Sequence, residues 1–429
     1  MNERVRIGIL GCGHVGSALV RLVHDHADVI EARAGVPLEV ARVAVANLAK
    51  ARDLPLPARC FTDDAAAVVG DPDVDIVVEV IGGIEPARTL IVEALMSGKP
   101  VVTANKELIA AYGRELFETA EGAGVDLLFE ASVGGGIPLI RPLRESLAGD
   151  RIRRVMGIVN GTTNYILTAM TDGGASFADA LADAQRLGFA ETDPTADVEG
   201  FDAAAKAAII ASIAFGARVV AGDVYREGIT GISADDIASA RDLGYVVKLL
   251  AIAEDFDGEI AVRVHPAMVP VHHPLASVRD SFNAVFIEGD AVGELMLYGR
   301  GAGGMPTASA VLGDLVDAAK NLVEGRKGAT VGTMAPRPIR AIENVESQFY
   351  LQMEVADRPG VLHAITGEFG RRGVSVRSMQ QRGIGDDARL IFVTHKAREA
   401  DLREAVEAAR QLEPVHRIGS VLRVIGEEE

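Results

Sequence analysis

A glycine-rich loop near the N-terminus constrains the fold of this chain more than any other feature. The apolar segment 5–10 runs into Gly11-Cys12-Gly13-His14-Val15-Gly16, and a helical pattern follows to about residue 32. In such a strand–loop–helix unit, the first glycine makes the tight turn, the second lets the main chain approach a pyrophosphate, and the third lets the helix pack on the strand. The amides of the first helical turn then face the anion. We therefore predict a dinucleotide site at Gly11, Gly13, His14, Val15 and Gly16, with a tight turn that holds no ligand as the alternative.

Short apolar segments alternate with helical patterns through the first 130 residues. The connections are short, and Thr62 is expected to cap a short helix. This alternation indicates an α/β domain with a doubly wound parallel sheet, the Rossmann fold, over residues 1–135. The expected strands are 5–10, 38–46, 74–81, 101–104 and 125–130, and the expected helices include 86–97 and 107–121.

The pattern changes after the glycines at 134–136, and we assign two further domains and a linker beyond them. Residues 136–325 are expected to form an α+β domain for substrate binding and dimerisation, although the helix at 305–325 could return to the first domain. Residues 326–349 indicate a linker because they contain glycine and prolines. Residues 350–429 follow a βαββαβ order, which predicts a small, independent ferredoxin-like domain. The elements expected in the middle domain are helices at 140–147, 201–220 and 306–323 and strands at 152–159, 260–264 and 284–288.

Composition narrows the choice of partners and compartment. The 43 Lys and Arg residues against 61 Asp and Glu give a formal charge of -18, which repels phosphate backbones, so we expect no nucleic-acid partner. The longest apolar run, 207–217, is too short to span a bilayer. Cys12 and Cys60 form neither a disulfide framework nor a zinc spacing. Residues 1–23 imitate a signal peptide, but glycines interrupt the apolar run and no cleavage site follows. We therefore expect a soluble, cytoplasmic protein with no membrane partner.

The end of the second expected strand bears on the choice of dinucleotide. An NAD site usually has an acidic residue there for the ribose hydroxyl. This chain has Ala46-Asn47 instead, followed by Lys50 and Arg52. Two cations and no carboxylate favour a 2′-phosphate, so we predict NADP(H) over NAD(H). The alternative is that Lys50 and Arg52 are ordinary surface residues.

Asp202 and Lys206 lie four residues apart and would share one face of the long helix. An isolated pair of this kind is most often an ordinary salt bridge. Here apolar residues at 207–210 follow the lysine, which indicates the margin of a buried face, and an acidic loop from Glu191 to Glu199 comes just before. A cation at this position could donate a proton to a carbonyl oxygen as negative charge develops on it. The carboxylates could bind a substrate amino group.

Several segments in combination resemble the homoserine dehydrogenase family over about residues 5–325. They are Thr103-Ala104-Asn105-Lys106, Asn160-Gly161-Thr162-Thr163-Asn164-Tyr165-Ile166-Leu167, Gly188-Phe189-Ala190-Glu191-Thr192-Asp193-Pro194, Asp197-Val198-Glu199-Gly200-Phe201-Asp202 with Lys206, and Gly301-Ala302-Gly303-Gly304-Met305-Pro306-Thr307-Ala308-Ser309. The combination is far more specific than any one of these motifs.

The resemblance implies NAD(P)-dependent interconversion of L-aspartate 4-semialdehyde and L-homoserine, in the biosynthesis of threonine, methionine and isoleucine. It makes Lys206 the proton donor in the reducing direction, with Asp202 beside it, and puts the catalytic residue Lys106 at the junction of cofactor and substrate. The implied substrate contacts are Glu191, Asp202, Asp197 and Thr163, and the implied further cofactor contacts are Lys106, Gly188 and Gly303.

The resemblance also implies a monovalent cation, sodium or potassium, matched by Glu130 and the backbone of Val133, Gly135 and Ile137. Carbonyl oxygens of a glycine run suit an alkali cation. A loop that merely turns the chain between domains explains residues 134–136 equally well. The family often ends its second strand in an Arg-Asp pair, and this chain departs from that pattern at Ala46-Asn47.

Residues 350–426 resemble an ACT domain, an amino-acid-sensing module. The resemblance is carried by Val355-Ala356-Asp357-Arg358-Pro359-Gly360-Val361-Leu362, where a strand turns into a helix. Helix amides at such a loop can bind a carboxylate, so Asp357, Gly360, Val361 and Leu362 are the expected regulatory residues. The resemblance implies threonine as effector and a homo-oligomer, dimer or tetramer. The alternative is a purely structural dimerisation module.

Three hypotheses for the function follow. The first is a homoserine dehydrogenase with a regulatory C-terminal domain. The second is a dehydrogenase of another amino-acid semialdehyde, against which the carboxylates around Lys206 argue. The third is a catalytically silent sensor that keeps NADP for structure alone, and an intact acid–base lysine argues against it.

Overall fold

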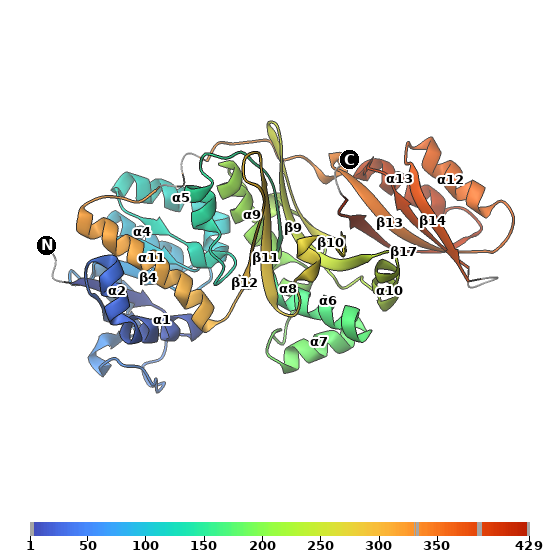
Figure 1. The fold of residues 1–429 in the computed structure, drawn as a ribbon. Coiled ribbons are helices and arrows are strands. Elements are labelled where there is room, and N and C mark those ends of the chain that lie inside the picture. The colour runs from blue at the N-terminus through green and yellow to red at the C-terminus, as the bar shows by residue number, and fades with distance from the viewer. Residues whose placement is uncertain (1–3, 330, 332–333, 384–387, 427–429) are drawn as a thin grey trace. The chain divides into compact units, whose positions relative to one another are not determined.

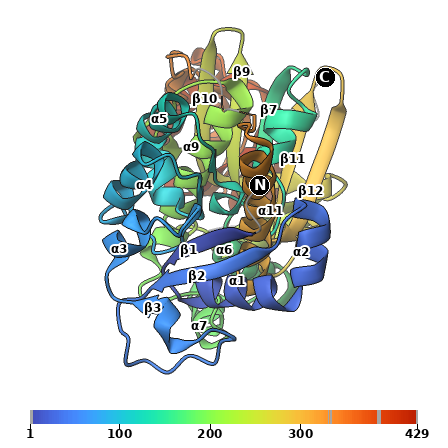
Figure 2. The same cartoon turned by 90° about the vertical axis from the view of Figure 1, so that its left-hand side faces the viewer.

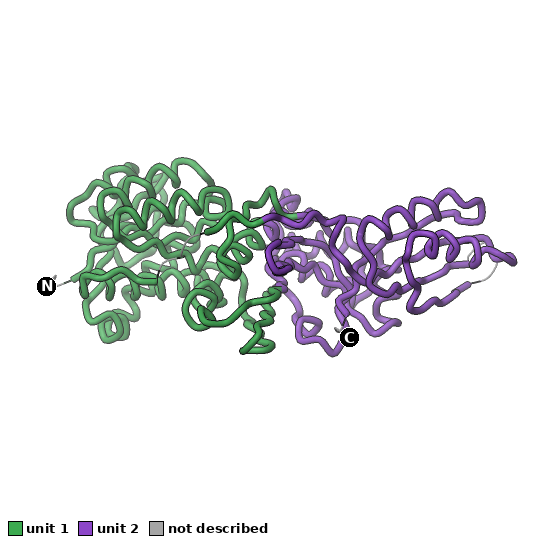
Figure 3. Tube along the Cα trace, turned by 90° about the horizontal axis from the view of Figure 1, so that it is seen from above, with its two compact units in different colours: residues 1–155, 205–224, 282–337 green, residues 156–204, 225–281, 338–429 purple. Residues whose placement is uncertain are grey.

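The computed structural model describes residues 4–329, 331, 334–383 and 388–426. Parts of the expected domains and linker, at 1–3, 330, 332–333, 384–387 and 427–429, lie outside the described residues. The chain divides into two compact units (Figure 3). The first holds residues 1–155, 205–224 and 282–337, and the second holds residues 156–204, 225–281 and 338–429.

A six-stranded parallel sheet forms the centre of the first unit, in the order β3-β2-β1-β4-β5-β6. Helices cover both faces, with α1, α2 and α11 on one face and α3, α4 and α5 on the other (Figures 1 and 2). The predicted Rossmann fold is thereby confirmed. The elements are β1 (Val5–Leu10), α1 (His14–Asp25), α2 (Ala27–Ala34), β2 (Leu38–Ala44), β3 (Phe61–Thr62), α3 (Ala65–Gly70), β4 (Ile76–Glu79), α4 (Ala87–Met96), β5 (Val101–Thr103), α5 (Lys106–Ala123), β6 (Leu127–Leu128) and α11 (Gly304–Glu324).

The helix α11 is distant in sequence from the other helices of this sheet and packs along α1. Leu19 of α1 and Leu315 of α11 are fully buried in the same apolar cluster as Ile7 and Ile9 of β1. Full burial of one such side chain contributes about 1.5–3 kcal/mol. This contact fixes the N-terminal ends of α1 and α11 beside each other. The first unit also holds the antiparallel hairpin of β11 (Phe282–Gly289) and β12 (Gly293–Arg300).

Three expected helices differ from the structure. Asp64, and not Thr62, caps α3, because its Oδ1 accepts the amide of Ala67 at 3.0 Å while Thr62 belongs to β3. The helix expected at 140–147 is a short π-helical segment, Pro142–Ser146. The long helix α9 (Phe201–Phe215) ends before residue 220, because Gly216 takes a left-handed conformation with φ 58°.

In the second unit, six strands lie in the order β9-β10-β17-β13-β15-β14. The long hairpin of β9 (Tyr245–Phe256) and β10 (Glu259–Pro270) was predicted only at 260–264. Residues 247–253 are buried without interruption, so they lack the alternation that marks a half-buried strand, and periodicity alone cannot tell them from a helix. The other elements here are α6 (Gly161–Gly173), α7 (Phe177–Arg186), α8 (Thr195–Val198), β8 (Tyr225–Arg226) and α10 (Ala234–Asp242), and β7 (Ile152–Ile158) runs from the first unit into this one.

The C-terminal elements follow the predicted βαββαβ order. Their sheet continues into the hairpin, because β17 pairs in parallel with β10 through Ala267↔Arg423 and Met268↔Val424. This pairing covers the edge of β17, which would otherwise be exposed, so the C-terminal elements share a sheet with the hairpin. The elements are β13 (Glu346–Val355), α12 (Val361–Arg371), β14 (Val376–Arg382), β15 (Arg389–Thr394), β16 (Ala397–Arg398), α13 (Glu399–Arg410) and β17 (Val415–Val424). Across the described ranges, no helix has the length and apolar character needed to cross a membrane.

Candidate active site

The glycine loop between β1 and α1 is built from main chain in close contact. Gly11 has φ 101°, and a Cβ on Gly16 would lie 2.2 Å from the carbonyl oxygen of Gly11. Neither position admits a side chain without movement of backbone. A Cβ on Gly13, in contrast, would have no atom within 4 Å. Packing therefore does not require glycine at position 13, and the space beside it is open to a ligand.

Two helices begin beside each other at this loop without a side chain to cap them. The N-cap of α1 is Gly13, the N-cap of α11 is Gly303, and neither provides a capping hydrogen bond. A Cβ on Gly304 would come within 3.0 Å of the carbonyl oxygen of His14, which shows how closely the two helix starts approach. The uncapped amides and the two helix dipoles favour an anion at this point.

The loop after β2 holds both predicted phosphate-binding cations. The guanidinium of Arg52 donates to the carbonyl oxygens of Lys50 (2.9 Å) and Asn47 (3.0 Å) and lies over the ring of Phe61. Arg52 is thus half-buried and held in place by its own loop, whereas Lys50 is exposed. Both lie on the polypeptide that follows the carboxyl end of β2.

Lys106 is the first residue of α5, and a chain of buried hydrogen bonds holds the turn before it. The carboxylate of Glu79, fully buried at the end of β4, accepts the hydroxyl of Thr103 at 2.6 Å and the amide of Ile81 at 2.8 Å. The Thr103 hydroxyl accepts the amide of Asn105, and Asn105 caps α5. Lys106 therefore lies at the carboxyl edge of the sheet, where ligands of this fold bind.

The turn predicted to hold a cation is braced by buried carboxylates. The side chain of Glu130 accepts the amides of Leu139, Ile140 and Arg141 at 2.5–2.8 Å, so both of its oxygens are occupied. Asp314 of α11 accepts the amide of Glu130 and the guanidinium of Arg141, each at 2.8 Å. Burial, together with the charge of Glu130, raises the pKa of Asp314 to about 7. Among the described residues, no three His, Cys, Asp or Glu side chains gather as a metal site would require.

In the second unit, Asn160 connects the acidic residues predicted to bind substrate. Its side-chain amide donates to Asp197 at 2.6 Å and to Asp202 at 2.8 Å, while its oxygen caps α6 by accepting the amide of Thr163. Thr162 donates its hydroxyl to Asp197 at 2.9 Å. These hydrogen bonds hold two carboxylates together that would repel each other if unpaired. The predicted contact residue Thr163 is buried and donates its hydroxyl to Asn160, so it acts within the cap of α6.

Lys206 lies one turn after Asp202 on α9, and both side chains are more than nine-tenths buried. The loop before α8 is more open. Glu191 is exposed, and its carbonyl oxygen accepts the side chain of Gln185 at 3.0 Å. Gly188, at the end of α7, has φ 78° and is exposed. Glu191 and Gly188 are thus accessible to solvent, whereas Asp202 and Lys206 lie on the buried face of α9.

Two buried polar residues near Asp197 and Asp202 were not predicted as functional from the sequence. The role of Asn160 follows from its position immediately before a helix, where an asparagine side chain commonly caps the first turn. Lys248 of β9 donates to Asn164 at 2.9 Å and to the carbonyl oxygen of Val278, and burial lowers its pKa to about 8. The signal was a single lysine within the apolar run 246–253.

In the C-terminal domain, the predicted effector loop joins β13 to α12. Gly360 caps α12 with φ 92°, which favours glycine, and provides no side-chain cap. Asp357 accepts the side chain of Gln381 from β14 at 3.0 Å. Val361 is buried and Leu362 is 40% exposed. The start of α12 thus has no side-chain cap and lies beside an ordered carboxylate.

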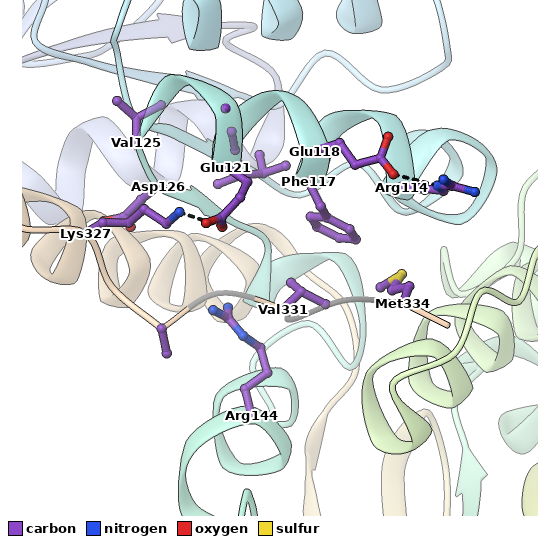
Figure 4. Close-up of a pocket in the computed structure, with 14 residues that line it drawn as sticks. Arg114, Phe117, Glu118, Glu121, Val125, Asp126, Arg144, Lys327, Val331 and Met334 are labelled. Atoms are coloured by element: carbon purple, nitrogen blue, oxygen red, sulfur yellow. Dashed lines mark hydrogen bonds and ion pairs between the residues drawn. The ribbon is translucent and has the colours of Figure 1, made fainter. Parts of the chain in front are cut away.

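A cavity of about 550 Å³ lies elsewhere in the first unit, beside α5 and the segment that follows α11 (Figure 4). Two ion pairs stand on its wall, Arg114 with Glu118 at 2.7 Å and Lys327 with Glu121 at 2.6 Å. None of the predicted site residues lines it.

Comparison with known proteins assigns the family. Family models match residues 11–130 ("Homoserine dehydrogenase, NAD binding domain"), 138–316 ("Homoserine dehydrogenase") and 349–414 ("ACT domain"). Homoserine dehydrogenase of Corynebacterium glutamicum is 53% identical over 98% of this chain and 95% of that protein. The crystal structure of a homoserine dehydrogenase from Thiobacillus denitrificans matches with a TM-score of 0.93 at 42% identity, covering 98% of both chains. A hyperthermophilic archaeal homoserine dehydrogenase in complex with NADPH matches with a TM-score of 0.62 at 30% identity, covering 73% of this chain and 97% of that one.

The parallel sheet, the glycine loop and the uncapped helix starts define an NAD(P)-binding protein of the Rossmann class. The high identity extends over nearly the whole chain. This chain belongs to the homoserine dehydrogenase family and carries a C-terminal ACT domain, so it is an oxidoreductase acting on CH–OH groups.

Proposed function

We propose that this protein interconverts L-aspartate 4-semialdehyde and L-homoserine with NAD(P) as cofactor, a step towards threonine, methionine and isoleucine. One observation carries the proposal. Asn160 holds Asp197 and Asp202 together at the start of α9, and Lys206 follows one turn later on that helix. This set provides carboxylates for an amino group and a cation for a carbonyl oxygen.

In the proposed mechanism, the bound dinucleotide supplies or accepts the hydride. Lys206 donates a proton to the aldehyde oxygen as negative charge develops there, and accepts it back in the oxidising direction. Glu191, Asp197 and Asp202 bind the substrate amino group, with Thr163 supporting Asn160 between them. Lys106 orients substrate against the cofactor from the start of α5.

We propose NADP(H) as the preferred dinucleotide. Gly11, Gly13, Gly16 and the amides of His14 and Val15 would hold the pyrophosphate. Gly188 and Gly303 would line the rest of the site. Support for a 2′-phosphate comes from Lys50 and Arg52 after β2, and from the archaeal relative solved with NADPH.

A monovalent cation, sodium or potassium, is proposed at the turn 130–137. Three main-chain amides occupy the carboxylate of Glu130. The ligands would therefore be carbonyl oxygens of Glu130, Val133, Gly135 and Ile137, which are hard donors. The cation would stiffen the turn that leads from β6.

We further propose that the ACT domain binds L-threonine through Asp357, Gly360, Val361 and Leu362, and that the protein forms a homo-oligomer, a dimer or tetramer. The start of α12, which has no side-chain cap, supports a carboxylate ligand. The strand β14 ends its sheet, so its outer edge is available for pairing with a second copy.

The test is the absorbance of reduced dinucleotide after mixing the protein with L-homoserine and NADP, then with NAD, at alkaline pH with potassium or sodium present. We expect reduced cofactor with both and a higher rate with NADP. Folded protein that gives no signal with either would contradict the proposal and favour a silent sensor. Other hydroxy amino acids in the same assay test the choice of substrate.

A further inference from the structure

A buried arginine of the ACT domain pairs with a carboxylate of a segment that contacts the turn between Asp197 and Asp202. Arg423 of β17 is 4% exposed. Its guanidinium donates two hydrogen bonds of 2.9 Å to Glu227, one to each oxygen. It also donates to Glu399 at the start of α13, with the longer bond at 3.1 Å. One guanidinium thus pairs with two carboxylates, of which Glu399 is 10% exposed and Glu227 is 36% exposed.

Glu227 belongs to a short segment, residues 225–230, which the rest of the second unit holds at several points. The amide of Glu227 donates to the carbonyl oxygen of Val264 in β10 at 2.8 Å, and its carboxylate accepts the hydroxyl of Tyr225. Burial raises the pKa of Glu227, but the hydrogen bonds and charge of Arg423 outweigh this and leave it below its ordinary value. Glu227 is therefore ionised at neutral pH, with Arg423 as its charged hydrogen-bond partner and Tyr225 as a neutral one.

Segment 225–230 also contacts the turn between Asp197 and Asp202, the two carboxylates proposed to bind the substrate. Arg226 donates to the carbonyl oxygen of Glu199 at 2.7 Å, and its guanidinium lies 3.4 Å from the centre of the Phe201 ring. Thr230 donates to the carboxylate of Glu199 at 3.0 Å, and the amide of Ile229 donates to the carbonyl oxygen of Val198 at 2.8 Å.

Space between the segment and the turn is tight. A Cβ on Gly228 would lie 2.4 Å from the carbonyl oxygen of Val198, and a Cβ on Gly200 would lie 3.4 Å from that of Glu227. Close-packed backbone of this kind transmits a displacement instead of absorbing it. Asp197 precedes this turn and Asp202 follows it, so the turn determines where both carboxylates lie.

We propose that Arg423 is a positioning residue for the reaction: through Glu227 it fixes segment 225–230, and through that segment the turn between Asp197 and Asp202. The inference rests on the proposed function, which assigns both carboxylates to the substrate. The last strand of the ACT domain would then help to position the substrate carboxylates Asp197 and Asp202 even when no effector is bound.

The test compares Arg423→Met with Arg417→Met, both in the full-length chain. Arg417 is a matched control because it lies on the same strand, 70% exposed, in a surface pair with Glu354. We expect Arg423→Met to raise KM for L-homoserine about tenfold or more, with KM for NADP changed less than about twofold. Arg423→Lys should restore part of the loss, and Arg417→Met should match the wild type. A folded Arg423→Met protein with wild-type KM for L-homoserine overturns the proposal.

Two further measurements cover the other outcomes. If Arg423→Met does not fold, Glu227→Gln decides, because it keeps the volume but weakens the pair, and an unchanged KM for L-homoserine overturns the proposal. If the wild type does not oxidise L-homoserine, the proposed function fails by itself. Hydrogen exchange of residues 197–202 then decides: faster exchange in Arg423→Met than in Arg417→Met supports the positioning role, and equal exchange overturns it.

Discussion

The proposed dinucleotide site and the proposed substrate site are built in different ways. In the first unit the site consists mainly of main chain, with glycines that exclude side chains and helix starts that leave amides free. In the second unit it consists of side chains that hydrogen-bond one another, with Asn160 between Asp197 and Asp202. A side-chain atom added at a glycine should therefore disturb packing or ligand binding at the main-chain site. At the side-chain site, ligand binding should weaken when a hydrogen-bond donor or a charge is replaced.

Exchange of the proposed proton donor should have the largest effect. Lys206→Ala should lower kcat by about 10²–10⁴, because general acid catalysis is lost. The dissociation constant for NADPH should stay close to that of wild type. The measurements are steady-state kinetics and a fluorescence titration with NADPH, and Lys396→Ala, at an exposed lysine, is the control. Similar losses in turnover and in NADPH affinity would identify an ordinary salt bridge.

Two glycine-to-alanine variants distinguish an effect on stability from an effect on dinucleotide binding at the main-chain site. Gly16→Ala should destabilise the protein by about 1–3 kcal/mol through overpacking, because the new Cβ would lie 2.2 Å from the carbonyl oxygen of Gly11. Gly13→Ala should change stability by less than about 0.5 kcal/mol yet weaken NADPH binding about tenfold. Thermal unfolding and NADPH titration measure both, with Gly122→Ala, exposed near the end of α5, as control. A Gly13→Ala protein that binds NADPH like wild type would mean that the open space holds no dinucleotide.

In the side-chain half, Asn160→Asp exchanges a donor for a third carboxylate. The hydrogen bonds to Asp197 and Asp202 are lost, and losing a bond to a charged group costs about 1.5–3 kcal/mol. We expect KM for L-homoserine to rise about tenfold or more, with KM for NADP little changed. Asn344→Asp, at an exposed asparagine, is the control. A rise in both KM values by the same factor would show that the two halves do not differ as described.

A further prediction concerns the pH dependence of stability, through the buried carboxylate of Asp314 beside Glu130. Asp314 has a pKa of about 7 when folded against 3.8 as its ordinary value. Between these values the folded protein binds the extra proton, so the free energy of unfolding should fall as pH rises from about 4 to about 7. Asp314→Asn should flatten this slope, measured as Tm against pH. Asp317→Asn, the more exposed partner of Arg141, should leave it unchanged. Equal slopes in wild type and Asp314→Asn would contradict the assignment.

The site and the fold differ in how much of them could be predicted from sequence. The glycine loop, the alternating strands and helices, and the βαββαβ order were confirmed because each depends on neighbours along the chain. Thr62 as a cap was wrong because Asp64 competes for the same role two residues later. The hairpin of β9 and β10 was largely missed because a strand buried on both faces lacks alternation.

The sequence alone determined which residue types were available and where main-chain geometry was unusual. Gly16 is a local requirement, since a Cβ there would meet the carbonyl oxygen of Gly11 in the same loop, and Gly11 itself has a φ of 101° that favours glycine. Only the tertiary structure decided that Asn160 lies between Asp197 and Asp202, that β17 pairs with β10, and that Arg423 meets Glu227 across 196 positions. Contacts between distant segments depend on how helices and strands pack, and burial then changes their electrostatics, so no local pattern encodes them.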